Sequence, residues 1–138
     1  MNKFSRAIML CAIVAGLFYA AGTITAFLAG YEWIVVLILL AGIGKAAALF
    51  APDAPLRNAF LGGFLMALTA VWTQGLFLDA YFAANPAYRV DEVALGLGPQ
   101  SWTFIMAPLG ALVAGGISLA AAALVRVLVK IFGKRVHG

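Results

Sequence analysis

Charged residues are scarce in this sequence of 138 residues. They make up 10% of the chain, whereas 65% of it is hydrophobic and the mean hydropathy is +1.07. A soluble domain is about half apolar and about a quarter charged, so a soluble fold of this composition would lack the polar residues to cover its surface. Disordered chains are rich in charge and poor in apolar residues, which excludes disorder as well. The composition predicts an integral membrane protein, with residues 1–138 forming one domain.

Cysteine and histidine are almost absent, with Cys11 and His137 the single examples. One cysteine can form neither an internal disulfide nor a metal site built from thiolates. A single histidine outside the apolar stretches excludes haem held between transmembrane histidines and zinc held by several of them. No P-loop, nucleophile elbow or dinucleotide fingerprint is present. We therefore expect no cofactor, no metal and no catalytic residue.

Four long apolar stretches predict transmembrane helices. Each is near the length of about 20 residues that crosses a bilayer core, and the absence of polar–apolar alternation argues against a transmembrane barrel. The expected fold class is an all-α integral membrane protein, a four-transmembrane-helix bundle. We expect Asp53 to cap the third helix and Pro55 to lie in its first turn. The predicted helices cover approximately residues 6–30, 32–51, 55–83 and 101–131, and residues 84–100 form an outer loop.

The charge distribution predicts that both termini are cytoplasmic. With four spans, eight of the nine basic residues fall on the inner side, as the positive-inside rule requires. The outer side carries four acidic residues and Arg89, and all three tryptophans lie near the outer interface as an aromatic belt. The Ala- and Gly-rich helices suggest a bacterial inner membrane. The inner basic residues are Lys3, Arg6, Lys45, Arg57, Arg126, Lys130, Lys134 and Arg135.

Two features leave alternatives open. Lys3, Arg6 and the small residues up to Gly22 resemble a cleavable signal peptide, whose removal would leave three spans. Pro108 removes one backbone donor from the fourth helix. That helix either tilts and kinks at Pro108, or it spans only from Pro108 onwards, with the preceding segment at the interface.

Small residues recur at four-residue spacing along three of the predicted helices. Such rows let helices approach closely in a membrane. They predict packing inside the bundle, and contacts between copies of the chain could add to this. The rows are Ala12, Gly16 and Ala20; Gly22, Ala26 and Gly30; Ala59, Gly63 and Ala67; and Gly110 with Ala114.

Polar residues gather in the predicted outer half of the bundle and form a candidate crevice. Tyr19, Thr23 and Thr25 lie there on the first helix. Alternatively, the threonines bond carbonyls of their own helix and Gln74 bonds a neighbouring helix, because a primary amide in lipid needs a partner. We expect Gln74 to point into the bundle. The candidate crevice residues are Gln74, Asp79, Thr73, Thr69, Trp72 and Glu32.

Two further groups are candidate contact residues. Arg89, Asp91 and Glu92 in the outer loop either bind a partner or belong to a simple connector. On the cytoplasmic side, Lys45 is expected to snorkel, and Lys45 and the basic stripe of the fourth helix are expected to meet anionic lipid headgroups. The stripe comprises Arg126, Lys130 and Lys134.

Three functions fit these observations. The first is a small non-enzymatic membrane protein, an accessory or stabilising subunit that works through helix packing with another membrane protein or with its own copies. The second is an oligomeric transporter or channel with a polar crevice open to the outside, although no acidic residue lies in the middle of a predicted span. The third is an enzyme acting on lipid or quinone at the outer interface. Basic residues at membrane edges argue against nucleic acid as a partner.

Overall fold

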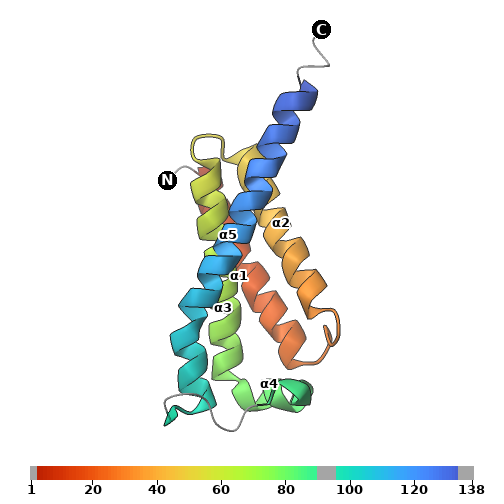
Figure 1. Cartoon of the computed structure of the whole chain (residues 1–138), viewed down its shortest axis with the longest axis vertical. Helices are drawn as coiled ribbons and strands as arrows, with labels where there is room; N and C mark the ends of the chain where they lie inside the picture. Colours follow the sequence, from red (N-terminus) through yellow and green to blue (C-terminus); the bar gives the residue numbers. More distant parts are fainter. Residues whose placement is uncertain (1–2, 90–95, 134–138) are drawn as a thin grey trace.

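The computed structural model describes residues 3–89 and 96–133, which are helical with short connections and contain no strand (Figure 1). Four of the helices are long and apolar enough to cross a membrane. This confirms the prediction of an all-helical chain with four long apolar segments. The helices are α1 (Lys3–Ile24), α2 (Glu32–Phe50), α3 (Pro55–Leu76), α4 (Leu78–Ala84), the 3-10 helix η1 (Pro86–Tyr88) and α5 (Pro99–Gly133).

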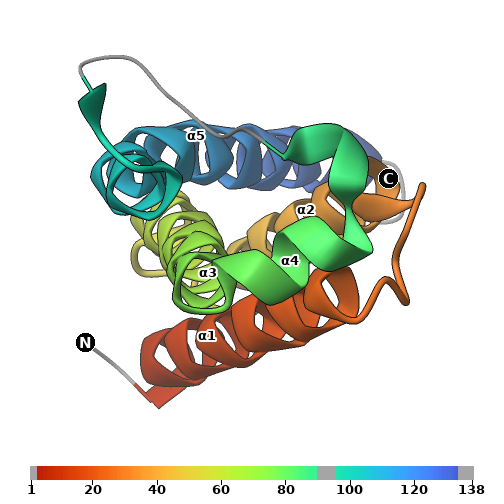
Figure 2. The ribbon, with the colours of Figure 1, turned by 90° about the horizontal axis from the view of Figure 1, so that it is seen from below.

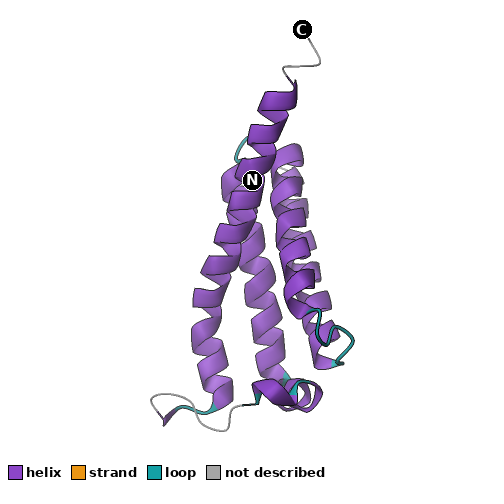
Figure 3. Ribbon diagram, turned by 45° about the vertical axis from the view of Figure 1, so that its right-hand side comes forward, coloured by secondary structure: helices purple, strands orange, loops and turns teal. Residues whose placement is uncertain are grey.

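The four long helices alternate in direction and pack side by side. Helix α3 contacts α1, α2 and α5, and α1 and α5 lie on opposite sides of the α2–α3 pair (Figure 2). The short α4 lies across one end of the long helices, which we call the α4 end (Figure 3). The opposite end carries the start of α1, the turn at residues 51–54 and the end of α5. We call it the turn end.

Glycines hold these helices together by close backbone approach. A Cβ added at Gly16 of α1 would meet the carbonyl oxygen of Met66 in α3. One added at Gly63 of α3 would lie 2.8 Å from the carbonyl oxygen of Ala114 in α5. These two glycines therefore serve packing within the chain, as their four-residue spacing predicted. Gly110 differs, because nothing lies within 4 Å of the Cβ it could carry.

Helix α1 ends earlier than the predicted residue 30. After Ile24 the chain turns, and Ala26 adopts a left-handed conformation with φ of 58°. The buried Leu28 folds back onto Gly22, where an added Cβ would lie 2.7 Å from its side chain. The expected helical row of Gly22, Ala26 and Gly30 therefore does not form. The residues of this turn are as apolar as the helix before it, so the hydropathy pattern predicted a helix up to residue 30.

The third predicted helix divides into two. Helix α3 ends at Leu76 and the chain bends at Phe77, so that α4 leaves the direction of α3. Trp72 and Asp79, seven residues apart, would share a face of one helix over residues 55–83, but they lie on the separate helices α3 and α4. At the start of α3, Pro55 occupies the first turn as expected. The N-cap residue is Ala54 rather than Asp53, and no side chain caps it.

Helix α5 is continuous on both sides of Pro108. It begins at Pro99, two residues before the predicted start, and ends at Gly133. At 1.5 Å per residue, its 35 residues measure roughly 50 Å, which exceeds the bilayer core of about 30 Å. Part of α5 must therefore lie outside the core of any membrane that it crosses, unless the helix tilts strongly.

Candidate functional site

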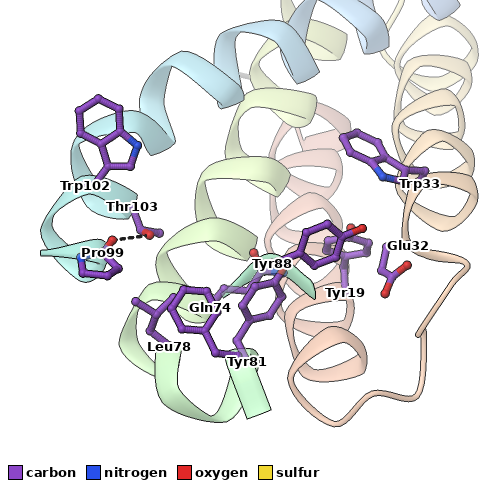
Figure 4. Close-up of a pocket in the computed structure, with 11 residues that line it drawn as sticks. Tyr19, Glu32, Trp33, Gln74, Leu78, Tyr81, Tyr88, Pro99, Trp102 and Thr103 are labelled. Atoms are coloured by element: carbon purple, nitrogen blue, oxygen red, sulfur yellow. Dashed lines mark hydrogen bonds between the residues drawn. The ribbon is translucent and has the colours of Figure 1, made fainter. Parts of the chain in front are cut away.

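An aromatic cavity lies at the α4 end of the molecule. Its volume is about 350 Å³, and α1, α2, α3, α4, η1 and α5 all contribute lining residues (Figure 4). Trp33 of α2 and Trp102 of α5 stand on opposite sides of it, and Gln74 of α3 lies between them. We call this space the aromatic cavity. Of the predicted crevice residues, Gln74 and Glu32 line it.

Gln74 points into the bundle, as predicted. Its Nε2 donates a hydrogen bond of 2.7 Å to Oγ1 of Thr23 in α1. That hydroxyl in turn donates to the carbonyl oxygen of Ala20 at 2.9 Å. Thr23 is 1% exposed. These two hydrogen bonds therefore connect α3 to α1 through a buried hydroxyl next to the cavity-lining residue Gln74. The Gln74 amide thus satisfies one of its donors inside the protein rather than facing lipid.

Asn85 holds the α4 segment against α1. Its Nδ2 donates to the carbonyl oxygen of Thr23 at 2.9 Å and to that of Tyr81 at 3.0 Å. The side chain is buried, although it follows α4 at an end of the molecule. These bonds place Tyr81 and the following 3-10 helix beside the aromatic cavity.

Among the described residues that line the aromatic cavity, Glu32 is the one that carries a charge. It begins α2 and lies beside Tyr19 and Trp33 (Figure 4). Burial, with Tyr88 and Glu32 adding to its effect, raises the pKa of the Tyr81 phenol above its ordinary value. No described lysine or arginine lines the cavity, so the carboxylate of Glu32 carries the formal charge of its described lining.

The structure separates the other predicted crevice residues from this cavity. Thr73 donates to the carbonyl oxygen of Thr69 at 2.7 Å, the bond within one helix that was the alternative interpretation. The Cβ of Thr69 faces Gly16 of α1, 3.1 Å from where a Cβ would stand. Trp72 is 45% exposed and does not line the aromatic cavity.

Asp79 and Arg89 line a different groove at the α4 end. This groove has a volume of about 590 Å³ and is shared with the start of α5 through Pro99 and Gln100. Asp91 and Glu92, the other candidate partner residues, lie outside the described residues. The sequence predicted that Asp79 and Gln74 line one crevice. In the structure Gln74 lines the aromatic cavity, and Asp79 lines the neighbouring groove.

An apolar groove runs between α1 and α2 toward the turn end. Its volume is about 560 Å³. Three lining residues of α1 are small and four residues apart, and on α2 Gly42 and Ala46 have the same spacing. We call it the α1–α2 groove. These small residues are Ala7, Cys11, Ala15, Gly42 and Ala46.

The predicted lipid-contacting lysines and arginines lie toward the turn end. Arg126 and Lys130 of α5 are exposed and line a space of about 700 Å³ with Leu49 and Leu56. Lys45 is exposed on α2 and does not line that space. Lys134 lies outside the described residues. These positions are compatible with headgroup contact, which remains a prediction.

Within residues 3–89 and 96–133, no three His, Cys, Asp or Glu side chains come together as a metal site would require. Comparisons with family models, with curated proteins and with solved structures found no match. The sequence placed Trp33 and Trp102 in an interfacial belt but did not bring them into one cavity with Tyr81 and Tyr88. It also missed Asn85 and the row Ala7–Cys11–Ala15. The four-residue spacing of that row was the signal that could have found it.

Proposed function

We propose that this protein is a small, non-enzymatic integral membrane protein, an accessory subunit that binds a transmembrane helix of another membrane protein in the α1–α2 groove. The observation that carries the proposal is the pair of small-residue rows facing the same space. Ala7, Cys11 and Ala15 span about 12 Å of α1, or roughly two helical turns. Rows of this kind allow a third helix to approach two others closely, and close packing drives helix association in lipid.

The remaining packing of the chain supports this choice of surface. Gly16, Gly44 and Gly63 are occupied by contacts between α1, α2, α3 and α5. By contrast, nothing lies within 4 Å of the Cβ that Gly42 could carry. The α1–α2 groove thus offers small residues that the chain's own packing leaves exposed, as at Ala7, Cys11 and Gly42, or partly covered, as at Ala15 and Ala46.

The orientation that we propose places the α4 end outside and both termini in the cytoplasm, in a bacterial inner membrane. Six described basic residues lie at or near the turn end, whereas the α4 end carries Glu32, Asp79 and Arg89. The positive-inside rule favours this arrangement. The six are Lys3, Arg6, Lys45, Arg57, Arg126 and Lys130.

Filling the groove tests the proposal. Gly42→Leu projects a side chain into open space, so the chain's own fold should tolerate it while a docked helix should not. Gly116→Leu is the matched control, because its Cβ also meets nothing within 4 Å and it lies on α5, outside the groove. After purification in mild detergent, mass spectrometry should find a stoichiometric partner with the parent chain and Gly116→Leu. Recovery with Gly42→Leu should fall by about tenfold, since each 1.4 kcal/mol of lost packing is one such factor.

Equal recovery of the partner with both variants would contradict the groove as the binding site. Failure to find any stoichiometric foreign protein would contradict the accessory-subunit proposal itself. Both variants must first give the same elution volume and helical content as the parent chain.

A homo-oligomer is the second candidate. The position of Cys11 in the groove makes this candidate testable by cross-linking. Cys11 is the single cysteine, is exposed and lines the groove. If two copies met groove to groove around a twofold axis, their Cys11 side chains would come together. Mild oxidation in membranes would then give a covalent dimer, whereas a foreign helix in the groove would prevent that product.

A further inference from the structure

The aromatic cavity combines many rings with a single charge. Its rings come from five elements, so it is built by the tertiary fold rather than by one helix face. The volume of about 350 Å³ is at the lower end of the range for small-molecule sites. The aromatic lining residues are Tyr19, Trp33, Tyr81, Phe82, Tyr88 and Trp102.

The charge of this cavity selects the sign of a ligand. Among the described lining residues Glu32 alone is charged, and the described arginine at this end, Arg89, lines the separate groove with Asp79. An anion would meet the Glu32 carboxylate without a partner, and a purely apolar ligand would strip water from that carboxylate without replacing it. A cation would be attracted both by the carboxylate and by the faces of the rings.

The chemistry of the lining residues indicates which kind of cation the cavity would bind. Hard metal ions take six or more oxygen ligands, and the lining offers one carboxylate among mainly aromatic and apolar side chains. Alkyl-substituted ammonium groups instead carry a diffuse charge on an apolar surface, which suits aromatic walls. Trp102 and Trp33 contribute tryptophan rings, the type that binds such cations best, although Trp33 is 74% exposed and borders the open side of the cavity.

We propose that the aromatic cavity binds an organic ammonium group of about the size of choline, with Glu32 as its counter-charge and the surrounding rings in contact with its alkyl groups. Gln74, fixed by its bond to Thr23, forms the polar side of the site. This inference goes beyond the proposed function, because the aromatic cavity and the α1–α2 groove share no lining residue.

Choline and its neutral isostere 3,3-dimethyl-1-butanol provide the test. The full chain, purified in a neutral sugar detergent, is titrated with each compound while tryptophan fluorescence is followed. Because the two compounds have the same shape, tighter binding of choline measures the contribution of its charge. We expect choline to bind about tenfold more tightly, because the Glu32 carboxylate and the ring faces both attract its positive charge and neither attracts the neutral compound in the same way.

Two carboxylates at the same end supply a matched pair of variants. Glu32→Gln should weaken choline binding by about tenfold or more, because the variant keeps the shape of the side chain and loses its charge. Asp79→Asn removes a charge from the neighbouring groove and should change affinity less than about twofold. A second pair, Trp102→Leu against Trp72→Leu, separates a ring of the cavity from an exposed ring outside it. The first should lose binding and the second should keep it.

Three results would overturn the proposal: equal affinity for choline and its neutral isostere, equal loss in Glu32→Gln and Asp79→Asn, or full binding by Trp102→Leu. Nanodiscs then identify the source of the ammonium group. If phosphatidylcholine competes with choline and phosphatidylglycerol does not, the site takes a lipid headgroup. If neither lipid competes, it takes a free organic cation. Gly42→Leu should leave choline binding unchanged, so failure of this inference and failure of the groove proposal are distinguishable.

Discussion

Two glycines on α2 show how neighbouring residues of one type can have opposite roles. A Cβ at Gly44 would meet the carbonyl oxygen of Ser118 and would lie 2.8 Å from Cβ of Ala121, both on α5. A Cβ at Gly42 would meet nothing within 4 Å. At this crossing Ser118 also donates to the carbonyl oxygen of Leu40 at 3.0 Å. Gly44 therefore sets the separation of α2 and α5, and Gly42 does not.

We therefore predict opposite stability effects for Gly44→Ala and Gly42→Ala. Both changes raise helix propensity by roughly 0.5–1 kcal/mol. Gly44→Ala also forces α2 and α5 apart, and overpacking of this kind costs about 1–3 kcal/mol. Thermal unfolding in detergent should show a lower midpoint for Gly44→Ala and an unchanged or higher one for Gly42→Ala. A Gly44→Ala variant as stable as the parent would mean that this crossing adjusts freely.

At the scale of single residues, the sequence predicted the surroundings of a side chain when its chemistry left few alternatives. Gln74 was expected to bond a neighbouring helix because an amide in lipid must find a partner, and it does so. Trp72 and Trp102 could not be told apart by the same reasoning. Both are tryptophans near one end of an apolar helix, yet Trp102 lines the cavity and Trp72 does not, a difference that depends on tertiary packing rather than on composition.

At the scale of elements, α4 depends on one buried side chain. Asn85 bonds backbone carbonyls of both α1 and α4, and α4 itself has no buried residue. Few apolar contacts therefore hold this helix in place. An element of this kind belongs to the less stable part of a fold.

We predict that Asn85→Ala loosens α4 without unfolding the long helices. The loss of two hydrogen bonds, one buried and one partly buried, should cost about 1–3 kcal/mol locally. Hydrogen exchange in a detergent micelle should become faster over residues 78–88 and stay unchanged over residues 60–70. Gln74→Leu is a suitable comparison, because a membrane hydrogen bond averages only about 0.6 kcal/mol and Thr23 keeps its own bond to Ala20. Equal protection of residues 78–88 in Asn85→Ala and the parent would show that other contacts hold α4.

The elements themselves were more predictable than their ends. Hydropathy located the four long helices, since each has to supply an apolar surface along its whole length. It overran the end of α1 because Ala26 and Leu28 are as apolar as the helix, although they form a turn. It merged α3 with α4 for the same reason at Phe77. Backbone bends that keep an apolar composition leave no signal in hydropathy.

At the scale of the whole molecule, the distance between α2 and α5 changes along their length. The two helices cross tightly where Gly44 meets Ser118, and at the α4 end Trp33 and Trp102 stand apart with the aromatic cavity between them (Figure 4). No composition or spacing rule predicts such a divergence, because it depends on where along the two helices the contact of Gly44 with Ser118 falls. The cavity is thus a consequence of how the helices cross.

The orientation of the chain yields the last prediction. The excess of lysine and arginine at the turn end should retain that end in the cytoplasm, as the positive-inside rule states. A reporter that is active only in the periplasm should therefore be active when fused after Gly30 or after Asn85, and inactive when fused after Asp53 or after Gly138. A cytoplasmic reporter at the same four positions is the control and should give the reverse pattern. Periplasmic activity at Gly138 would leave an odd number of spans. In that case the chain could not place α4 and the aromatic cavity outside while keeping both termini in the cytoplasm.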